Sequence, residues 1–167
     1  MTEKVQFTPQ PVIITIFVTL VTLGLYIPLW FIIHRTALNA LHENKRLPLN
    51  GPIAVVVLLS LWHLFNFLSF FTDFNGAGQF LKNIYDSIYL ISFIAGLIWS
   101  IILSFQAHRI LRTYSQAQDY DIEYVGLFTF ILNIFYLQFK VNQLIQYEET
   151  QVWDIDSIGQ HLENNPD

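Results

Sequence analysis

The sequence predicts an all-α protein, an integral membrane four-helix transmembrane bundle with helical extensions at the membrane surface. Hydrophobic residues make up 53% of the chain and charged residues only 13%, well below the ~25% charge typical of soluble domains. A helix that crosses the hydrocarbon core of a bilayer needs about 20 mostly apolar residues. Four stretches approach or meet this length: Val12–Ile33, Pro52–Phe71, Ile84–Phe105 and Tyr124–Phe139.

The first stretch is expected to remain in the protein as a membrane anchor. A signal peptide has a basic leading segment, a shorter apolar run and a cleavage site of small residues. Here only Lys4 supplies positive charge before the run, and no such cleavage site follows Ile33. Pro28 is expected to kink this helix. Residues 34–51 should then continue as a helix at the membrane surface and end in a turn that contains Pro and Gly.

The second and third stretches are each long enough to cross a bilayer. A short connection over residues 72–83, with an Asn-Gly turn signal, joins them. The fourth stretch is shorter as a purely apolar run. Val141, Leu144 and Ile145 can extend it toward the membrane surface.

Charge divides the chain into a four-span transmembrane domain over residues 1–147 and an acidic C-terminal tail over residues 148–167. The net charge is −5, and the tail alone holds six acidic residues with no Lys or Arg. Basic residues in short loops favour the cytoplasmic side. Four crossings would put five of them, Arg35, Lys45, Arg46, Arg109 and Arg112, in the cytoplasm, opposite Lys4, Lys82 and Lys140. Both termini are therefore expected outside the cytoplasm.

Four polar residues near the middle of the apolar stretches form a candidate midplane polar site. They are His63, Asn66, Asn133 and Thr22. A histidine at mid-bilayer depth needs a hydrogen-bond partner, and Asn133 offers both a donor and an acceptor. A polar clasp that sets helix register is the simpler interpretation. A proton relay, or a binding site for a headgroup or small solute, is the alternative.

Small residues recur at four-residue intervals along the third stretch: Ser92, Gly96, Ser100 and Ser104. In lipid, helices associate through close contact at small residues and through interhelical hydrogen bonds. We therefore expect this stripe to be a helix-packing face. Replacing Gly96 with Leu should separate the third helix from its neighbour.

No motif in the sequence names a reaction. The chain contains no cysteine, no Gly-rich phosphate loop, no HExxH and no GxSxG, and its acidic balance disfavours nucleic-acid binding. No metal, cofactor or catalytic residue is therefore expected, and the protein is not expected to be an enzyme. His34 and His108 each end an apolar stretch, so bis-histidine ligation of a b-type haem stays open as an alternative.

Two segments resemble a bacterial family of small multi-span membrane proteins of unknown function. The first is Thr22-Leu23-Gly24-Leu25-Tyr26-Ile27-Pro28-Leu29-Trp30, followed by Asn39, and the second is Tyr136-Leu137-Gln138-Phe139-Lys140-Val141-Asn142. The resemblance rests on Gly24, Tyr26, Trp30, Tyr136, Gln138 and Asn142. It implies a multi-span domain in the bacterial inner (cytoplasmic) membrane and no particular activity.

The residues themselves suggest roles for these segments. Tyr26 and Trp30 are expected to place their rings at the membrane surface. Gln138 and Asn142, one helical turn apart, are expected to hydrogen-bond the basic loop or a partner.

The lack of a catalytic constellation and the 16% aromatic content favour a non-enzymatic accessory or structural subunit of a larger membrane protein complex. Its partners would be membrane lipids and other membrane protein subunits, and no nucleic acid. A small transporter or channel that uses the midplane polar site is the first alternative. A haem-binding electron-transfer membrane protein is the second.

Overall fold

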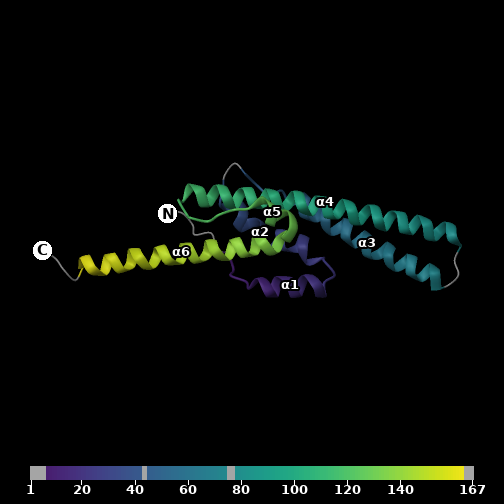
Figure 1. Cartoon of the computed structure of the whole chain (residues 1–167), viewed down its shortest axis with the longest axis horizontal. Coiled ribbons are helices and arrows are strands. Elements are labelled where there is room, and N and C mark those ends of the chain that lie inside the picture. Colours follow the sequence, from purple (N-terminus) through teal and green to yellow (C-terminus); the bar gives the residue numbers. More distant parts are fainter. Residues whose placement is uncertain (1–6, 43–44, 75–77, 164–167) are drawn as a thin grey trace.

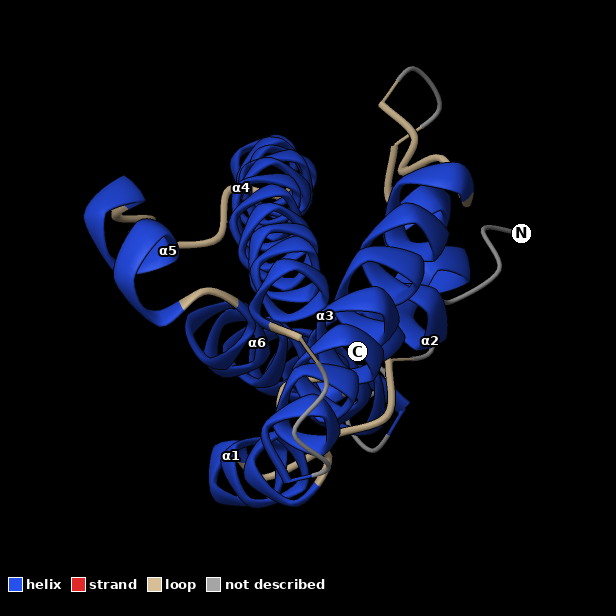
Figure 2. Cartoon of the chain, turned by 90° about the vertical axis from the view of Figure 1, so that its right-hand side faces the viewer, coloured by secondary structure: helices blue, strands red, loops and turns tan. Residues whose placement is uncertain are grey.

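A computed structural model describes the backbone of residues 7–42, 45–74 and 78–163, and the side chains of residues 7–42, 45–72 and 78–150. Within these ranges every regular element is an α-helix, which confirms the predicted all-α class. The six helices form three hairpins, α1–α2, α3–α4 and α5–α6 (Figure 1). Seen along the long axis of the molecule, α1 and α5 lie at its periphery (Figure 2).

The first hairpin consists of α1 (Val12–Val21) and α2 (Tyr26–Ala40). The chain reverses between them because Leu23 and Gly24 have positive φ angles of 50° and 90°, and Gly adopts this backbone region without a steric penalty. The stretch expected to form one span is therefore two shorter helices. Pro28 lies in the first turn of α2, where a missing N–H leaves no helical bond unmade, so the chain turns before it rather than at it.

The second hairpin, α3 (Asn50–Phe74) and α4 (Gln79–Ala117), is the longest part of the molecule. Residues Asn50–Thr72 and Gln79–Ala117 are the two helical segments of the described chain that are long and apolar enough to cross a membrane. The two helices pack tightly near the start of α3. A Cβ on Gly51 would lie 2.8 Å from Leu103 Cδ2, so only glycine fits at this contact without movement of Leu103.

The third hairpin consists of α5 (Gly126–Leu132) and α6 (Ile134–Glu163), with the reversal at Asn133. Asn133 has φ 48° and ψ −123°, which interrupts the helix expected over Tyr124–Phe139. The segment before α5 runs back along α6. There the Val125 N–H donates to the Tyr136 hydroxyl at 2.8 Å, and the Tyr147 hydroxyl donates to the Asp121 carbonyl at 3.0 Å.

Helix α6 continues without interruption across residue 148, the predicted start of the acidic tail, as far as Glu163. Residues 164–167 and the side chains from residue 151 onward lie outside the described residues. The division into a transmembrane domain and an acidic tail therefore stays a prediction. The predicted four-span bundle is not confirmed, because two of its four stretches are each divided by a reversal of the chain.

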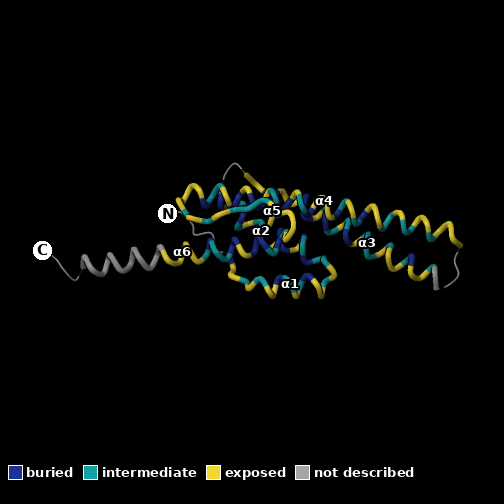
Figure 3. Tube along the Cα trace, viewed as in Figure 1, coloured by how far each residue is buried: buried dark blue, intermediate teal, exposed yellow. Residues whose placement is uncertain are grey.

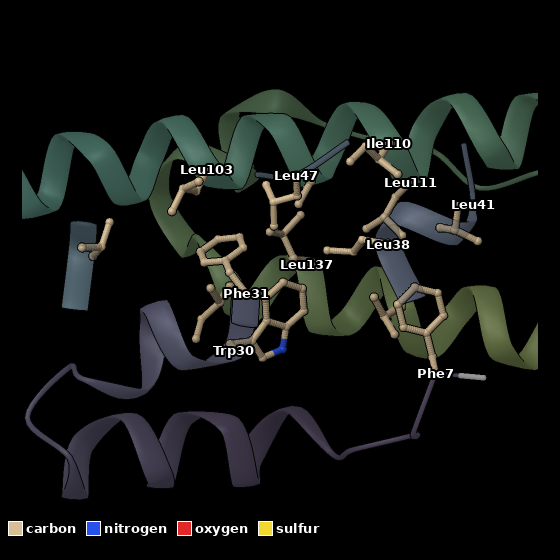
Figure 4. Packing of buried hydrophobic residues seen from close by; sticks show 14 of the residues in the cluster. Phe7, Trp30, Phe31, Leu38, Leu41, Leu47, Leu103, Ile110, Leu111 and Leu137 are labelled. Atoms are coloured by element: carbon tan, nitrogen blue, oxygen red, sulfur yellow. The ribbon is translucent and has the colours of Figure 1, made fainter. Parts of the chain in front are cut away.

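The buried core lies where all three hairpins meet, between α2, the second half of α4 and the first half of α6 (Figures 3 and 4). Its largest fully buried apolar side chains come from these helices and from the α2–α3 connection: Trp30, Phe31, Leu38, Leu47, Leu103, Leu111, Ile134, Leu137 and Leu144. The Asn39 amide fixes the connection, because it accepts from the Leu47 N–H at 2.6 Å and donates to the Leu47 carbonyl at 3.2 Å. Away from this core, apolar side chains point outward along α1, α3, α4 and α5.

Candidate functional site

The four residues of the predicted midplane polar site do not gather at one place. His63 Nε2 donates to the Leu23 carbonyl in the α1–α2 turn at 3.1 Å. Asn133 binds α4 instead: its Nδ2 donates to Ser100 Oγ at 3.0 Å, and its Oδ1 accepts from Ser104 Oγ. His63 therefore binds the α1–α2 turn, and Asn133 holds the α5–α6 reversal against α4. The two side chains do not form the clasp that the sequence suggested.

Neither Thr22 nor Asn66 hydrogen-bonds to His63 or Asn133, although Thr22 precedes Leu23 and Asn66 lies one helical turn after His63 on α3. The Thr22 hydroxyl donates to the Val18 carbonyl at 2.8 Å and accepts from the Tyr26 N–H at 3.0 Å, so it stabilises the α1–α2 turn locally. Asn66 is exposed on α3. Among the described residues no hydrogen bond joins these four side chains to one another, so a midplane solute site stays a prediction.

The small-residue stripe of α4 serves two neighbours. Gly96 faces α3, where a Cβ would lie 3.1 Å from Leu59 Cδ2. Ser100 and Ser104, one and two turns further along, are buried and bind Asn133 at the α5–α6 reversal. Ser92 is also buried, at 5% exposure. The stripe thus supplies close contact at one end and hydrogen bonds at the other.

Five residues from distant parts of the chain form a hydrogen-bonded motif network: Gln10, Tyr26, Trp30, Gln138 and Asn142. The Trp30 indole N–H donates to Gln138 Oε1 at 2.6 Å, and Gln138 Nε2 donates to Asn142 Oδ1 at 3.0 Å. Asn142 Nδ2 donates to the Gln10 carbonyl at 2.8 Å, and the Tyr26 hydroxyl donates to Gln10 Oε1 at 3.2 Å. The network joins the segment before α1 to α2 and α6.

The motif network differs from the sequence expectation in two ways. Trp30 has no exposed surface and is a core residue, so it does not anchor the membrane surface. Gln138 and Asn142 bind Trp30 and Gln10, not the basic loop. No sequence pattern pointed to Gln10, because an isolated Gln before an apolar helix has no characteristic spacing.

The two histidines weighed as haem ligands have separate surroundings. His34 Nδ1 donates to the Trp30 carbonyl at 2.9 Å, and its ring stacks on the Trp30 ring with 4.3 Å between centroids. Burial lowers the pKa of His34 below its ordinary value of 6.5. His108 Nδ1 lies 2.6 Å from the Thr129 hydroxyl on α5. Nδ1 of each histidine is therefore engaged with a neighbouring residue, the Trp30 carbonyl for His34 and the Thr129 hydroxyl for His108. Among the described residues, no three His, Cys, Asp or Glu side chains gather as metal ligands would.

A polar notch lies on the far part of the α3–α4 hairpin, and sequence reasoning missed it. Its cavity of about 440 Å³ is lined by Asn66, Ser69, Phe70, Lys82, Asp86, Tyr89 and Leu90. Ser69 Oγ donates to Asp86 Oδ1 across the helix pair. The signal was present as helical spacing, because Lys82, Asp86 and Tyr89 recur at intervals of four and three residues. It was missed because Asp86 was taken as part of an apolar stretch.

The chain matches no known protein-family model, no curated protein and no solved structure. The resemblance to a bacterial membrane family therefore stays an expectation from the two sequence segments.

Proposed function

We propose that this chain is an integral membrane protein that serves as a non-enzymatic accessory or structural subunit of a larger membrane protein complex. The first support is the exposure of its two long apolar helices. Only 17% of the most apolar window of α3 and 28% of that of α4 are buried. The core helix of a soluble protein would be covered on most sides, whereas lipid is the solvent that fits an uncovered apolar helix.

The other two hairpins would enter the bilayer part-way and return to the side from which they start. Helix α1 has 10 residues and α5 has 7, so they are about 15 Å and 10 Å long, against a hydrocarbon core of ~30 Å. A reversal inside a membrane is tolerated only where protein satisfies its polar groups. His63 does this at Leu23, and Ser100 and Ser104 do it at Asn133. This arrangement replaces the four full crossings expected from the stretches alone.

Part-way hairpins change the expected orientation. The first described residues, the end of α4 and the exit of α6 all lie at the end of the molecule opposite the α3–α4 reversal (Figure 1). Lys45 and Arg46 of the α2–α3 connection, Arg35, which binds the Leu47 carbonyl, and Arg109 and Arg112 in the last turns of α4 belong to that end, whereas Lys82 is in the first turn of α4 at the reversal. Because basic residues favour the cytoplasmic side, we place the basic end in the cytoplasm, together with residue 7 and helix α6. The prediction with both termini outside assumed four full crossings.

One observation carries the subunit proposal: the far part of the α3–α4 hairpin projects beyond the other four helices and combines a polar notch with exposed aromatic side chains (Figure 1). Phe67 and Phe70 are 61% and 67% exposed. Polar side chains in lipid are costly unless they are paired, and interhelical hydrogen bonds drive association there. A transmembrane helix of another subunit, with a polar side chain facing Asn66 and Asp86, is the occupant we infer.

Site-specific photo-cross-linking in the native membrane tests this surface. A photoreactive residue at Phe70 should yield one discrete protein adduct, and the same residue at Phe17 on α1, which is equally exposed at 65%, should yield none. Asn66→Leu should reduce the Phe70 adduct by removing a polar group of the notch. Native mass measurement after gentle extraction is the second readout. A lone monomer with no Phe70 adduct would contradict the proposal.

A further inference from the structure

A second cavity lies between α1 and the α5–α6 hairpin, whereas the polar notch is lined by α3 and α4. It has a volume of about 550 Å³, within the range of about 300–1,000 Å³ usual for small-molecule sites. Its walls are Val12 and Ile16 of α1, Val125, Phe128 and Leu132 around α5, and Phe135, Tyr136 and Phe139 of α6. The only charged side chains that line it are Glu123 and Lys140.

Lys140 is a buried cation with an unusual set of neighbours. The residue is 6% exposed, and its ammonium lies 5.3–5.5 Å from the ring centroids of Tyr124, Tyr136 and Phe139. The Lys140 ammonium donates a hydrogen bond to Gln143 Oε1 at 2.8 Å. Glu123 is the carboxylate that acts on this ammonium electrostatically, and within the described part of the chain it makes no hydrogen bond to it. A buried ammonium is costly unless it is paired, so an anion that enters the cavity would be stabilised there.

The negative charge of Glu123 restricts which anionic ligands the cavity can accept. Glu123 is exposed and lines the same cavity. A ligand with one negative group would meet Lys140 but would also be repelled by Glu123. A ligand with a phosphate and a neighbouring ammonium can satisfy both side chains. An ammonium that still carries protons can also donate hydrogen bonds to the carboxylate.

The outer surfaces of the cavity walls indicate that its mouth opens to hydrocarbon. On α1, Ile13 and Phe17 are 68% and 65% exposed, and on α5, Leu127 and Ile131 are both 62% exposed. If the part-way hairpins proposed above are correct, these faces contact acyl chains. An apolar cavity with its charges at one boundary then matches a lipid, whose tail and headgroup are divided in the same way.

We propose that this cavity is a binding site for one zwitterionic phospholipid of the phosphatidylethanolamine type. An acyl chain occupies the apolar groove between α1 and α5, the phosphate binds Lys140, and the ethanolamine ammonium binds Glu123. The proposal depends on the membrane placement of α1 and α5 and is independent of the notch on α3–α4.

Native mass spectrometry of the full chain in mild detergent, with equal amounts of phosphatidylethanolamine, phosphatidylglycerol and phosphatidylcholine added, tests this assignment. The wild type should retain one phosphatidylethanolamine. Lys140→Gln should lower the occupancy of all three lipids by about tenfold or more, because a charge-assisted bond is lost. Glu123→Gln should shift the preference to phosphatidylglycerol, because the repulsion of a net negative lipid is gone. Lys45→Gln, a matched charge removal outside the cavity, should change nothing.

A second variant keeps the test informative if Lys140→Gln does not fold. Ile16→Trp fills the groove from α1 and leaves both charges in place, so it should abolish the retained lipid while preserving helicity. Equal retention of the three lipids by the wild type would overturn the headgroup assignment. Retention that survives both Lys140→Gln and Ile16→Trp would overturn the site. Neither result bears on the Phe70 adduct, so the two proposals fail separately.

Discussion

Asn133 is the residue whose replacement tests most directly how the α5–α6 reversal is held. Its side chain makes two interhelical hydrogen bonds, to Ser100 and Ser104, and its backbone has a positive φ of 48°. Asn133→Ala removes both bonds, at about 1 kcal/mol each. The positive φ costs any residue with a Cβ about 1–2 kcal/mol, but Asn133 already bears this cost, so alanine adds little to it. We expect the free energy of unfolding to fall by about 2 kcal/mol.

Asn133→Gly separates the two contributions. It loses the same two hydrogen bonds, but it relieves the backbone because glycine adopts positive φ freely. The net loss should be about 0–1 kcal/mol, so glycine should be the milder substitution by about 1 kcal/mol or more. Equilibrium unfolding in mixed micelles of increasing SDS fraction, followed by circular dichroism, measures both values.

A double-mutant cycle completes the test of this reversal. Asn133→Gly combined with Ser104→Ala should show a coupling energy of about 0.5 kcal/mol or more, because the two side chains bond to each other. Equal losses for Asn133→Ala and Asn133→Gly would refute the backbone reasoning. A coupling energy of zero would refute the role assigned to the bond.

Three further substitutions test other contacts. Gly96→Leu should lower the melting temperature in detergent, because even a Cβ would lie 3.1 Å from Leu59, whereas Gly78→Leu has nothing within 4 Å and should be mild. Gln138→Leu should cost about 1–3 kcal/mol by leaving the buried Trp30 indole N–H without an acceptor, and adding Trp30→Phe should recover part of this loss in the same unfolding assay. The pKa of His34 is lowered by burial, so the unfolded chain binds the proton first as the pH falls. Stability should therefore decrease below about pH 6.5, and His34→Phe, which keeps the stacking on Trp30, should flatten that decrease in thermal scans.

The helical class could be predicted from the sequence because apolar runs without strand alternation leave few other choices. The two reversals could not, since hydropathy is the same for one long crossing and for two short helices that turn back. In the sequence, only the resemblance pointed to Gly24, whereas in the structure its positive φ makes the first turn. For the reversal at Asn133, the short length of the stretch Tyr124–Phe139 was the available signal. Its 16 residues would span about 24 Å as a helix, which is less than the ~30 Å hydrocarbon core.

The site residues were identified better than their partners. The stripe from Ser92 to Ser104 is buried, and the resemblance singled out four of the five residues that form the motif network. Sequence spacing places residues on one helix face, but it cannot choose which other helix that face meets. His63 and Asn133 were paired by depth along straight spans. The reversals move each to a different neighbour, so depth alone was a poor guide.

The three hairpins also determine what must cross the bilayer during biosynthesis. Under the proposed arrangement, the first and third hairpins begin and end on the same side, so neither has to translocate a hydrophilic segment. Only the end of α3 and the start of α4 reach the far side, and Lys82 is the single basic residue translocated with them. The chain can therefore be inserted as three helical hairpins from the cytoplasmic side, with one charged tip to transfer, whereas four full crossings with both termini outside would transfer one connection and both termini.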